Sequence, residues 1–328
     1  MGRPKRSDLW KPDEIAVLHC VQRCGRGAFL AGIDPTTGRD YSSRRDRLRD
    51  RLRALVSVFG IEVVAFAIMP DHFHVMVRTR PDRVARWTDL EAAVRWLQAF
   101  PGRRDARQLG TSTEQTAQAL AADPARLARV RERLADVSWF MRSISEPIAR
   151  AANREDGTRG AFWEGRFKAQ RITDPFGALA TALYVDLNPV RAGLVPPPHA
   201  YPGTGAYERF QEGPSGPSGD ARATAGRKSP QTAYEPTNAT PASEPAWLAP
   251  VITEHEMRPP AASLNSKSIA PQRASEASIL PLPHLTTAGY LPILSWVAAE
   301  GAVARSHPCP DALRRMLAEW DIRPDVLR

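Results

Sequence analysis

The sequence contains few cysteines and no long apolar run, and each absence excludes a class of protein. Its 328 residues include three cysteines, Cys20, Cys24 and Cys309, which are too few for a disulfide framework. Three residues separate Cys20 from Cys24, a spacing that fits zinc sites poorly, so we interpret the thiols as buried or incidental. No apolar run approaches the ~18 residues that span a bilayer, and the opening segment MGRPKRSDLW lacks the apolar core of a secretion signal. We therefore expect a cytoplasmic protein without a membrane partner.

Positive charge is present in excess. The chain contains 45 Lys and Arg residues against 36 Asp and Glu residues, a formal net charge of +9. Residues 1–53 hold 13 basic and 7 acidic residues, so this segment alone has a net charge of +6. Such an excess favours a polyanionic partner, and nucleic acid is the most plausible one.

Composition divides the chain into three parts. Residues 10–202 alternate apolar runs with charged helical stretches, as a packed α+β domain does, and a charged helical insertion interrupts them at about 84–130. Residues 203–280 are rich in Pro, Ser, Thr, Ala and Gly without a sustained period, which predicts a disordered linker. Residues 281–328 regain helical periodicity and predict a small C-terminal module of two or three helices.

The first part predicts an antiparallel sheet. Periodicity indicates strands at residues 15–21, 61–69 and 72–78 and helices at residues 42–60 and 124–153. The order strand, helix, strand, strand, helix resembles the split βαβ arrangement of a ferredoxin-like sheet. The predicted fold class is therefore α+β, a ferredoxin-like antiparallel sheet with helices on one face.

The segment MPDHFHVMV, residues 69–77, places two histidines one residue apart in an apolar strand. A period of two puts His72, His74 and Met76 on one face of that strand. The histidine Cα atoms would lie about 6.6 Å apart, so both imidazoles can bind one ion. Because a His-x-His pair alone is a weak signal, two satisfied histidines on a half-exposed strand are the simpler interpretation of this segment by itself.

A second segment, residues 173–195, predicts a helix that carries Tyr184 and Asn188. Asp174 suits the N-cap and the following proline suits the first helical position. Tyr184 and Asn188 stand four residues apart and share a face, and Pro189 ends the helix near Asn188. Taken alone, Tyr184 is more simply an aromatic at the edge of the core, and Asn188 a cap of the next turn.

Together with FWEGRFKAQRI, residues 162–172, these two segments resemble the HUH single-tyrosine transposases (the insertion-sequence 200-like transposase superfamily), particularly the REP-associated tyrosine transposase branch. That family has a histidine–hydrophobic–histidine strand, a basic stretch with tryptophan, and a helix that ends in Tyr-x-x-x-Asn-Pro before Arg-Ala-Gly-Leu. All three occur here in family order, and the resemblance covers roughly residues 10–200. The chain departs from the family at Asp71, where many members have Asn, and in its insertion and tail, which compact members lack.

The resemblance implies a mobile-element transposase that cleaves single-stranded DNA and transfers strands in DNA transposition and recombination. It implies that His72 and His74 bind Mg²⁺ or Mn²⁺ beside the scissile phosphate. Tyr184 would be the nucleophile and would form a 5′-phosphotyrosine intermediate. Asn188 would complete the catalytic set as a third metal ligand or a phosphate-orienting group, although capping competes with this role.

Other residues are expected to contact the DNA. They are Arg23, Arg26, Trp163, Arg166 and Lys168, with Arg44, Arg45 and Arg47 as further candidates. A tryptophan can stack on a base while cations follow the backbone of a single strand. Core packing is an equal alternative for Trp163, and each arginine is equally a solvated surface residue.

The expected partner is single-stranded or hairpin-forming DNA, which implies association with a bacterial nucleoid. Two other functions remain open: a host-retained endonuclease that processes repeats, and a non-catalytic DNA-binding regulator. The histidine pair and Tyr184 argue against the regulator, and a generic metal hydrolase would not need the tyrosine. Compact relatives include dimers as well as monomers. We expect a monomer, because the insertion and the tail could cover the surface that a partner would use.

Overall fold

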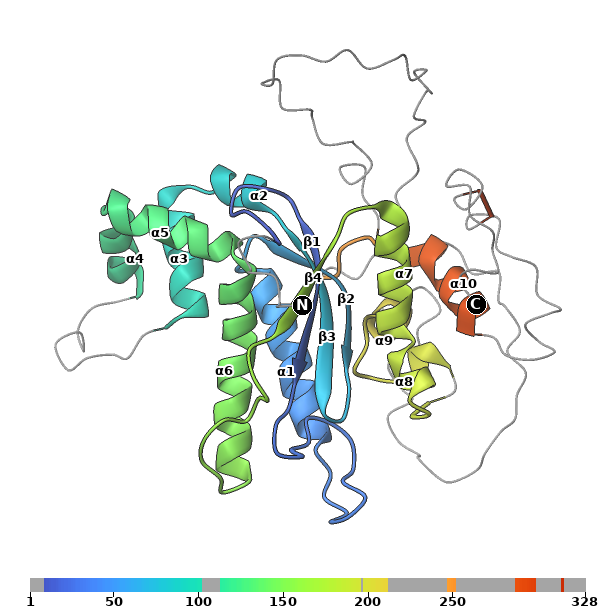
Figure 1. Ribbon diagram of the computed structural model, residues 1–328. Coiled ribbons are helices and arrows are strands. Elements are labelled where there is room, and N and C mark those ends of the chain that lie inside the picture. The colour runs from blue at the N-terminus through green and yellow to red at the C-terminus, as the bar shows by residue number, and fades with distance from the viewer. Residues whose placement is uncertain are drawn as a thin grey trace, which may run out of the picture.

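The computed structural model describes six parts of the chain, and four strands form its centre. The described parts are residues 9–101, 113–195, 197–211, 247–251, 287–298 and 314–315. The strands are β1 (Val17–Arg23), β2 (Ile61–Ile68), β3 (His72–Thr79) and β4 (Lys168–Ile172). They form one sheet in the order β2-β3-β1-β4, and each neighbouring pair is antiparallel (Figure 1). With helix α1 (Ser42–Val56) between β1 and β2, this is the order of a ferredoxin-like sheet, so the predicted α+β class is confirmed.

The local sequence explains most of the strands. All eight residues of β2 are buried, as its continuous apolar run predicts. In β3 the side chains alternate as predicted: Phe73 and Val75 belong to one core cluster and Met76 to the other. The sequence does not predict β4, because its residues KAQRI are mostly polar and exposed at the edge of the sheet.

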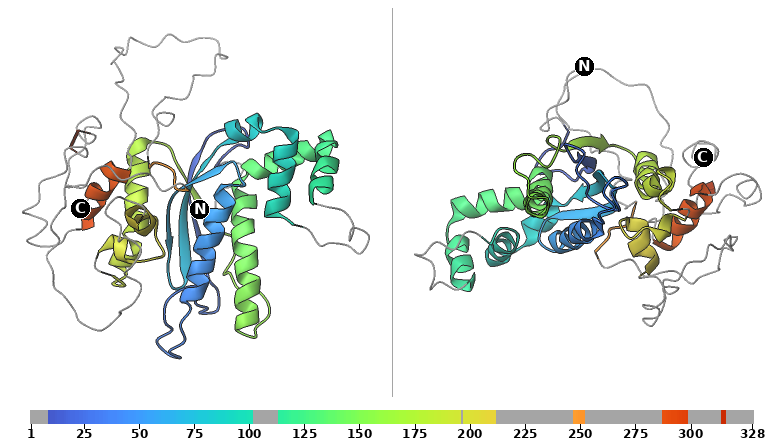
Figure 2. Two further views of the ribbon diagram at one scale, coloured as in Figure 1. Left: turned by 180° about the vertical axis from the view of Figure 1, so that it is seen from behind. Right: turned by 90° about the horizontal axis from the view of Figure 1, so that it is seen from below.

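Helices cover both faces of the sheet (Figures 1 and 2). α1 and α6 (Val137–Glu155) pack on one face, and α7 (Pro175–Asp186), α9 (Gly205–Gln211) and α10 (Thr287–Ala298) pack on the other. The two helices of the ferredoxin-like unit share a face as expected, but the prediction of helices on one face only is wrong. The physical reason is that β2 and β3 are apolar on both faces, so both faces have to be covered.

The predicted insertion is a group of short helices whose apolar residues join the core cluster of α1 and α6. They are α2 (Pro81–Arg86), α3 (Asp89–Ala99), α4 (Thr113–Ala121) and α5 (Pro124–Ala135). Residues 102–112 lie outside the described residues. The single helix predicted at 124–153 is wrong, because α5 and α6 are separate helices that meet at Asp136. The Asp136 carboxylate accepts the backbone N–H of Trp139 at 3.0 Å and so starts a new helix.

The folded domain extends beyond the predicted boundary at residue 202. α9 and residues 247–251 fall within the predicted linker, and α10 falls within the predicted C-terminal module. Tyr290 and Ile293 of α10 are fully buried in the core cluster that contains α7. The rest of the linker and module, residues 212–246, 252–286, 299–313 and 316–328, lies outside the described residues. No helix in the described parts is long and apolar enough to cross a membrane.

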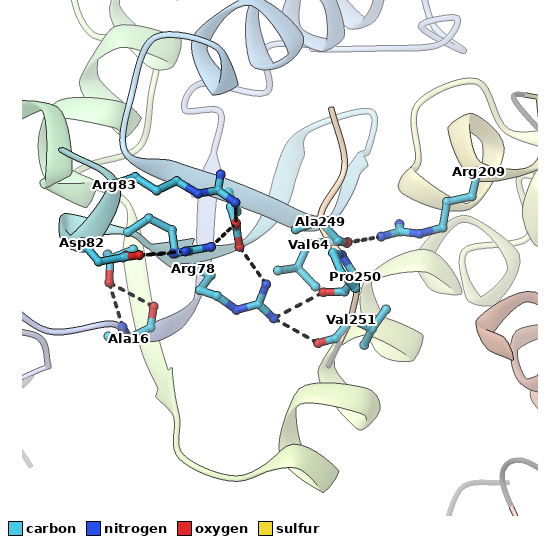
Figure 3. A network of polar contacts seen from close by, with 12 residues as sticks. Ala16, Val64, Arg78, Asp82, Arg83, Arg209, Ala249, Pro250 and Val251 are labelled. Atoms are coloured by element: carbon cyan, nitrogen blue, oxygen red, sulfur yellow. Dashed lines mark hydrogen bonds and ion pairs between the residues drawn. The ribbon is translucent and has the colours of Figure 1, made fainter. Parts of the chain in front are cut away.

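Residues 247–251 lie along the outer edge of β2 and cover it (Figure 3). The backbone N–H of Ala249 donates to the Val63 carbonyl at 2.8 Å. Arg209 of α9 donates to the carbonyls of Val64 and Ala249, each at 2.8 Å, and so joins the segment to the strand. An uncovered edge strand presents unpaired backbone groups to other chains, and this segment removes part of that edge.

Arg78 of β3 holds the end of the same segment. Its guanidinium donates to the carbonyls of Pro250 at 3.3 Å and Val251 at 3.4 Å (Figure 3). The Glu62 carboxylate accepts from Arg78 at 2.9 Å and from Arg80 at 2.6 Å, so the buried Arg78 charge is paired. Arg78 and Arg80 are therefore structural, since they stabilise the edge of the sheet.

We predict that Ala249→Pro loosens this edge. Proline removes the N–H that donates to Val63, and the unmatched carbonyl should lower the unfolding free energy by about 1–3 kcal/mol in a urea titration. The exposed edge of β2 should also increase self-association, measured by light scattering at several concentrations. Ala249→Ser keeps the N–H and is the matched control. Equal urea midpoints for the two variants would show that the hydrogen bond does not hold the segment.

Candidate active site

The pairing of β1 with β3 sets the composition of one sheet face. In this register Arg23 lies opposite His72, Val21 opposite His74, and His19 opposite Met76. Directly paired residues project from the same face of a sheet, so this face contains three histidines. It is the face on which α7 packs.

Helix α7 presents Tyr184 beside these histidines. The predicted N-cap is confirmed, because the Asp174 carboxylate accepts the Gly177 N–H at 2.7 Å. The Tyr184 ring lies 5.7 Å from the His74 ring and 6.0 Å from the His19 ring, in both cases edge to face. Its side chain is 42% exposed, which distinguishes it from the buried residues of the helix. The interpretation of Tyr184 as an aromatic at the edge of the core is correct for its position. Its neighbours at that edge are histidines, which can bind a metal ion or transfer protons.

The C-terminal end of α7 is fixed from within the core. Asp186 is fully buried and stands two residues after Tyr184. Its carboxylate accepts the Ala206 N–H at 3.1 Å and the Tyr290 hydroxyl at 2.9 Å, so α9 and α10 both hold this turn. The tyrosine is therefore carried by a helix whose end is anchored at two points.

Asn188 lies beside His74. It opens the short helix α8 (Asn188–Arg191), but Leu187 is the N-cap residue and no side-chain cap forms, so the predicted capping role is not used. The amide Nδ2 of Asn188 lies 3.4 Å from Nε2 of His74. At the other end of α8, the Arg191 guanidinium stands 5.7 Å from the centre of the Tyr184 ring. Tyr184 near the end of α7 and Asn188 at the start of α8 thus both reach His74 of the histidine strand.

His19 is the residue that sequence reasoning missed. Its Nε2 lies 2.9 Å from Nδ1 of His74, and the two rings are nearly parallel at 5.1 Å between centres. The available signal was its place in the first strand, because period two puts His19, Val21 and Arg23 on one face. The face alone was insufficient, since the partner strand and its register were needed as well.

Asp71 holds the second imidazole of the site. Its Oδ1 lies 2.6 Å from Nδ1 of His72, and its Oδ2 lies 3.1 Å from the Arg23 guanidinium. Partial burial alone would raise the pKa of Asp71, but the hydrogen bond and charge of His72, together with Arg23, bring it below its usual value. The Asp71 carboxylate therefore orients His72 and is itself paired with Arg23, so it does not add an unpaired charge.

Burial keeps the inner histidines neutral. It lowers the pKa of His19 to about 4. For His74 burial is again the largest cause, and the neighbouring His19, His72 and Arg23 add to it, so that its pKa is about 3. A neutral imidazole has one N–H and one nitrogen with a free lone pair, which is the form that binds metals.

The donor set fits a divalent metal ion. Asp71 engages Nδ1 of His72, and His19 engages Nδ1 of His74, which leaves the Nε2 atoms as the ligand nitrogens. The Asn188 amide beside His74 offers an oxygen as well as a nitrogen. Among the described residues no group of three or more His, Cys, Asp or Glu side chains is arranged to hold a metal. The Asn188 amide beside His74 is the candidate for a third protein ligand in that part of the chain.

The predicted DNA contacts divide between the two sides of the sheet. Lys168 lies opposite Val21 in β4, so it shares the histidine face with Arg23, and both side chains are exposed. Arg166 is exposed in the turn before β4. Arg26 is occupied elsewhere, because it donates to the Arg159 carbonyl at 2.9 Å. The structure thus brings Arg23 and Lys168 to the site, but not Arg26.

Trp163 lies on the opposite face of the sheet from Tyr184. Its ring packs against Phe162 at 4.8 Å and Phe73 at 5.7 Å. Its indole N–H donates to the Ser145 carbonyl at 2.9 Å. These are the contacts of a core residue, so the structure agrees with the packing alternative for Trp163.

The arginines of α1 are mostly engaged in ion pairs. Arg44 is 1% exposed, and its guanidinium lies 2.7 Å from the Glu155 carboxylate and 2.5 Å from that of Asp156. Arg47 binds the other oxygen of Glu155 at 2.6 Å, and Arg45 pairs with Asp46 at 3.0 Å. The prediction of Arg44 as a phosphate contact is therefore wrong, because a buried, paired guanidinium cannot reach DNA.

Comparisons with known proteins leave the family of this chain open. No protein-family model matches it, and no curated protein matches it. A solved structure of a REP-associated tyrosine transposase bound to a REP hairpin is similar, with a TM-score of 0.38 and 14% sequence identity. That match covers 71% of this chain and 100% of the other. A likeness at this TM-score carries no argument about activity, so the function rests on the residues of the site.

We predict that Arg44 contributes to stability and not to DNA binding. Arg44→Met leaves Glu155 and Asp156 without their buried partner and should lower the unfolding free energy by about 3 kcal/mol. Arg47→Met removes an exposed partner of Glu155 and should cost at most about 1 kcal/mol. Urea titrations measure both values. If Arg44→Met were as stable as the wild type but bound DNA more weakly, the structural role of Arg44 would be contradicted.

The same ion pairs predict acid lability. Partial burial would raise the pKa of Glu155, but the hydrogen bonds from Arg44 and Arg47 outweigh it and hold the pKa below its usual value. A carboxyl group with a depressed folded pKa stabilises the protein above its unfolded pKa of about 4.3. This stabilisation is lost as the pH falls through the folded pKa. The urea concentration at the unfolding midpoint should therefore decrease as the pH is lowered below about 4. This decrease should be less steep for Arg44→Met.

Proposed function

We propose that the protein is a metal-dependent DNA strand transferase that cleaves single-stranded DNA with Tyr184 as its nucleophile. The observation that carries the proposal is the convergence of Tyr184, His72, His74 and Asn188. His74 and Asn188 are 114 residues apart in the sequence, yet their side chains lie 3.4 Å apart. The motif resemblance requires this set to meet, whereas unrelated surface residues would have no reason to do so.

The metal ligands in this proposal are His72, His74 and Asn188, and the ion is Mg²⁺ or Mn²⁺. Two nitrogens and one amide oxygen leave coordination positions for phosphate oxygens and water, and imidazole ligands favour Mn²⁺ over Mg²⁺. When bound, such an ion neutralises charge on a phosphate and orients it for in-line attack.

Tyr184 performs the bond exchange. Its phenol oxygen attacks the scissile phosphorus and forms the Tyr–O–P bond while the P–O3′ bond breaks. The phenol loses its proton, and the departing 3′ oxygen takes one up, so one piece of DNA ends in a 3′-OH. The other piece stays joined to Tyr184 through its 5′ phosphate. One phosphodiester replaces another, so its energy is conserved for the joining step.

The charges around Tyr184 support a single-stranded substrate. Arg23, Lys168 and Arg191 are exposed cations on or beside the histidine face, where they can hold successive phosphates. A single strand can bend so that one phosphate meets both Tyr184 and the histidines, whereas a rigid duplex presents its phosphates at fixed spacing. The hairpin-forming character of the substrate is an implication of the family resemblance.

We predict that Tyr184→Phe abolishes the covalent adduct. Loss of the hydroxyl should reduce cleavage by at least about 1,000-fold, because no other nucleophile replaces it. Purified protein is incubated with Mn²⁺ and hairpin DNA that is labelled at one end, and adducts are resolved on denaturing gels. Label at the 3′ end should move with the wild-type protein, and label at the 5′ end should not.

The control for this experiment is Tyr207→Phe, which removes a hydroxyl from α9 and leaves Tyr184, the two histidines and Asn188 unchanged. It should form the adduct normally. If Tyr184→Phe still forms the adduct, another residue is the nucleophile. If the wild-type protein binds the hairpin but forms no adduct with either label, the non-catalytic regulator becomes the better reading.

We predict that His72→Ala and His74→Ala each abolish Mn²⁺-dependent cleavage. Most non-specific affinity for DNA comes from phosphate contacts elsewhere, so gel-shift affinity should change little. Met76→Leu is the control, because residue 76 lies on the same strand face as the histidines and is not one of the proposed ligands. This variant should cleave DNA normally. Unchanged cleavage by both histidine variants would remove the histidines from the site.

A further inference from the structure

The two histidines of β3 have different partners at Nδ1. His72 is held by the Asp71 carboxylate at 2.6 Å, an orientation common among histidines that bind metals. His74 has no carboxylate partner among the contacts of its ring. The atom at its Nδ1 is Nε2 of His19, at 2.9 Å.

The proposed metal ligation determines the hydrogen atoms between these rings. A metal ion on Nε2 of His74, the nitrogen that faces Asn188, requires the lone pair of that atom to be free. The single N–H of a neutral His74 is then at Nδ1. That N–H then donates to Nε2 of His19, which has to be the unprotonated nitrogen of its ring.

We propose that His19 is a positioning residue of the metal site, where it fixes His74 in the tautomer with a free lone pair on Nε2. His19 stands diagonally across from His74 in the β1–β3 ladder, because Val21 is the directly paired residue. A diagonal neighbour on the same face lies within reach of a ring side chain. The inference rests on the proposed function, since it assigns His74 to a metal.

The site explains why a fixed tautomer matters at His74 in particular. A neutral imidazole divides between two tautomers when nothing selects one, and the tautomer with its proton on Nε2 cannot bind a metal through that atom. Asp71 performs the selection for His72, and it cannot serve both rings while it also binds Arg23. His19 supplies the missing acceptor, and its ring also lies edge to face with Tyr184 at 6.0 Å.

Substitutions at position 19 separate the hydrogen bond from packing. His19→Phe keeps an aromatic ring on the face and removes the acceptor. His19→Gln keeps an acceptor oxygen near the place of Nε2 and should retain much of the effect. Val21→Leu is the matched control, because it changes packing directly opposite His74 without removing a hydrogen bond. Circular dichroism and thermal unfolding select the folded variants.

The first measurement is the tautomer of His74 in the metal-free full chain. Long-range ¹H–¹⁵N spectra of histidine-labelled protein near pH 7 report which ring nitrogen carries the proton. We expect the proton on Nδ1 in the wild type, in Val21→Leu and in His19→Gln, and a mixture of tautomers in His19→Phe. A wild-type His74 with its proton on Nε2 would overturn the inference.

The second measurement is the affinity for Mn²⁺ alone, by electron paramagnetic resonance. His19→Phe should bind Mn²⁺ about 10- to 100-fold more weakly than the wild type, as removal of such a supporting partner does elsewhere. Val21→Leu should bind normally and His19→Gln should lie between. Equal Mn²⁺ affinity of His19→Phe and wild type would refute the role of His19, even if the wild type forms the DNA adduct. If the wild type forms no adduct but the tautomer and Mn²⁺ results hold, only the proposed function fails.

Discussion

The antiparallel ladder between β1 and β3 is the constraint on which the rest of the site depends. These are the two central strands of the sheet, so their register is fixed by partners on both sides. A shift by one residue would turn His19 and Arg23 to the opposite face, away from His72 and His74. The core enforces the register, because Leu18 and Cys20 alternate with His19 and are fully buried on the other side.

The second constraint is the cover on the histidine face. α7 packs over the apolar part of this face, and the buried Asp186 fixes the end of the helix to α9 and α10. Tyr184 is thereby held at the margin of the packed region, where it remains partly exposed beside the buried imidazole of His74. The low polarity around His74 and His19 keeps both rings neutral. One edge of α7 thus packs on the core and also carries Tyr184 beside the histidines.

Net charge was a poor guide to the position of the proposed DNA-binding surface. The basic segment 1–53 contains most of α1, and the arginines of this helix largely pair with carboxylates of α1 itself and of the C-terminal end of α6. Arg78 and Arg209 are also buried, and both hold backbone carbonyls at the edge of β2. A guanidinium with five donors satisfies several buried acceptors at once, which makes arginine useful inside a protein as well as on its surface.

The sequence by itself determined the local features: the alternation of β3, the Asp174 cap of α7, and the end of that helix close to Asn188. These follow from strand and helix periods and from hydrogen bonds a few residues apart, which are visible in one segment. Only the tertiary structure decided that His19 holds His74, that Arg44 is buried, and that Trp163 packs on the far face. Each of these contacts joins residues from separate elements. Their proximity depends on strand register and helix packing, which are set by the whole core and leave no signal in a single segment.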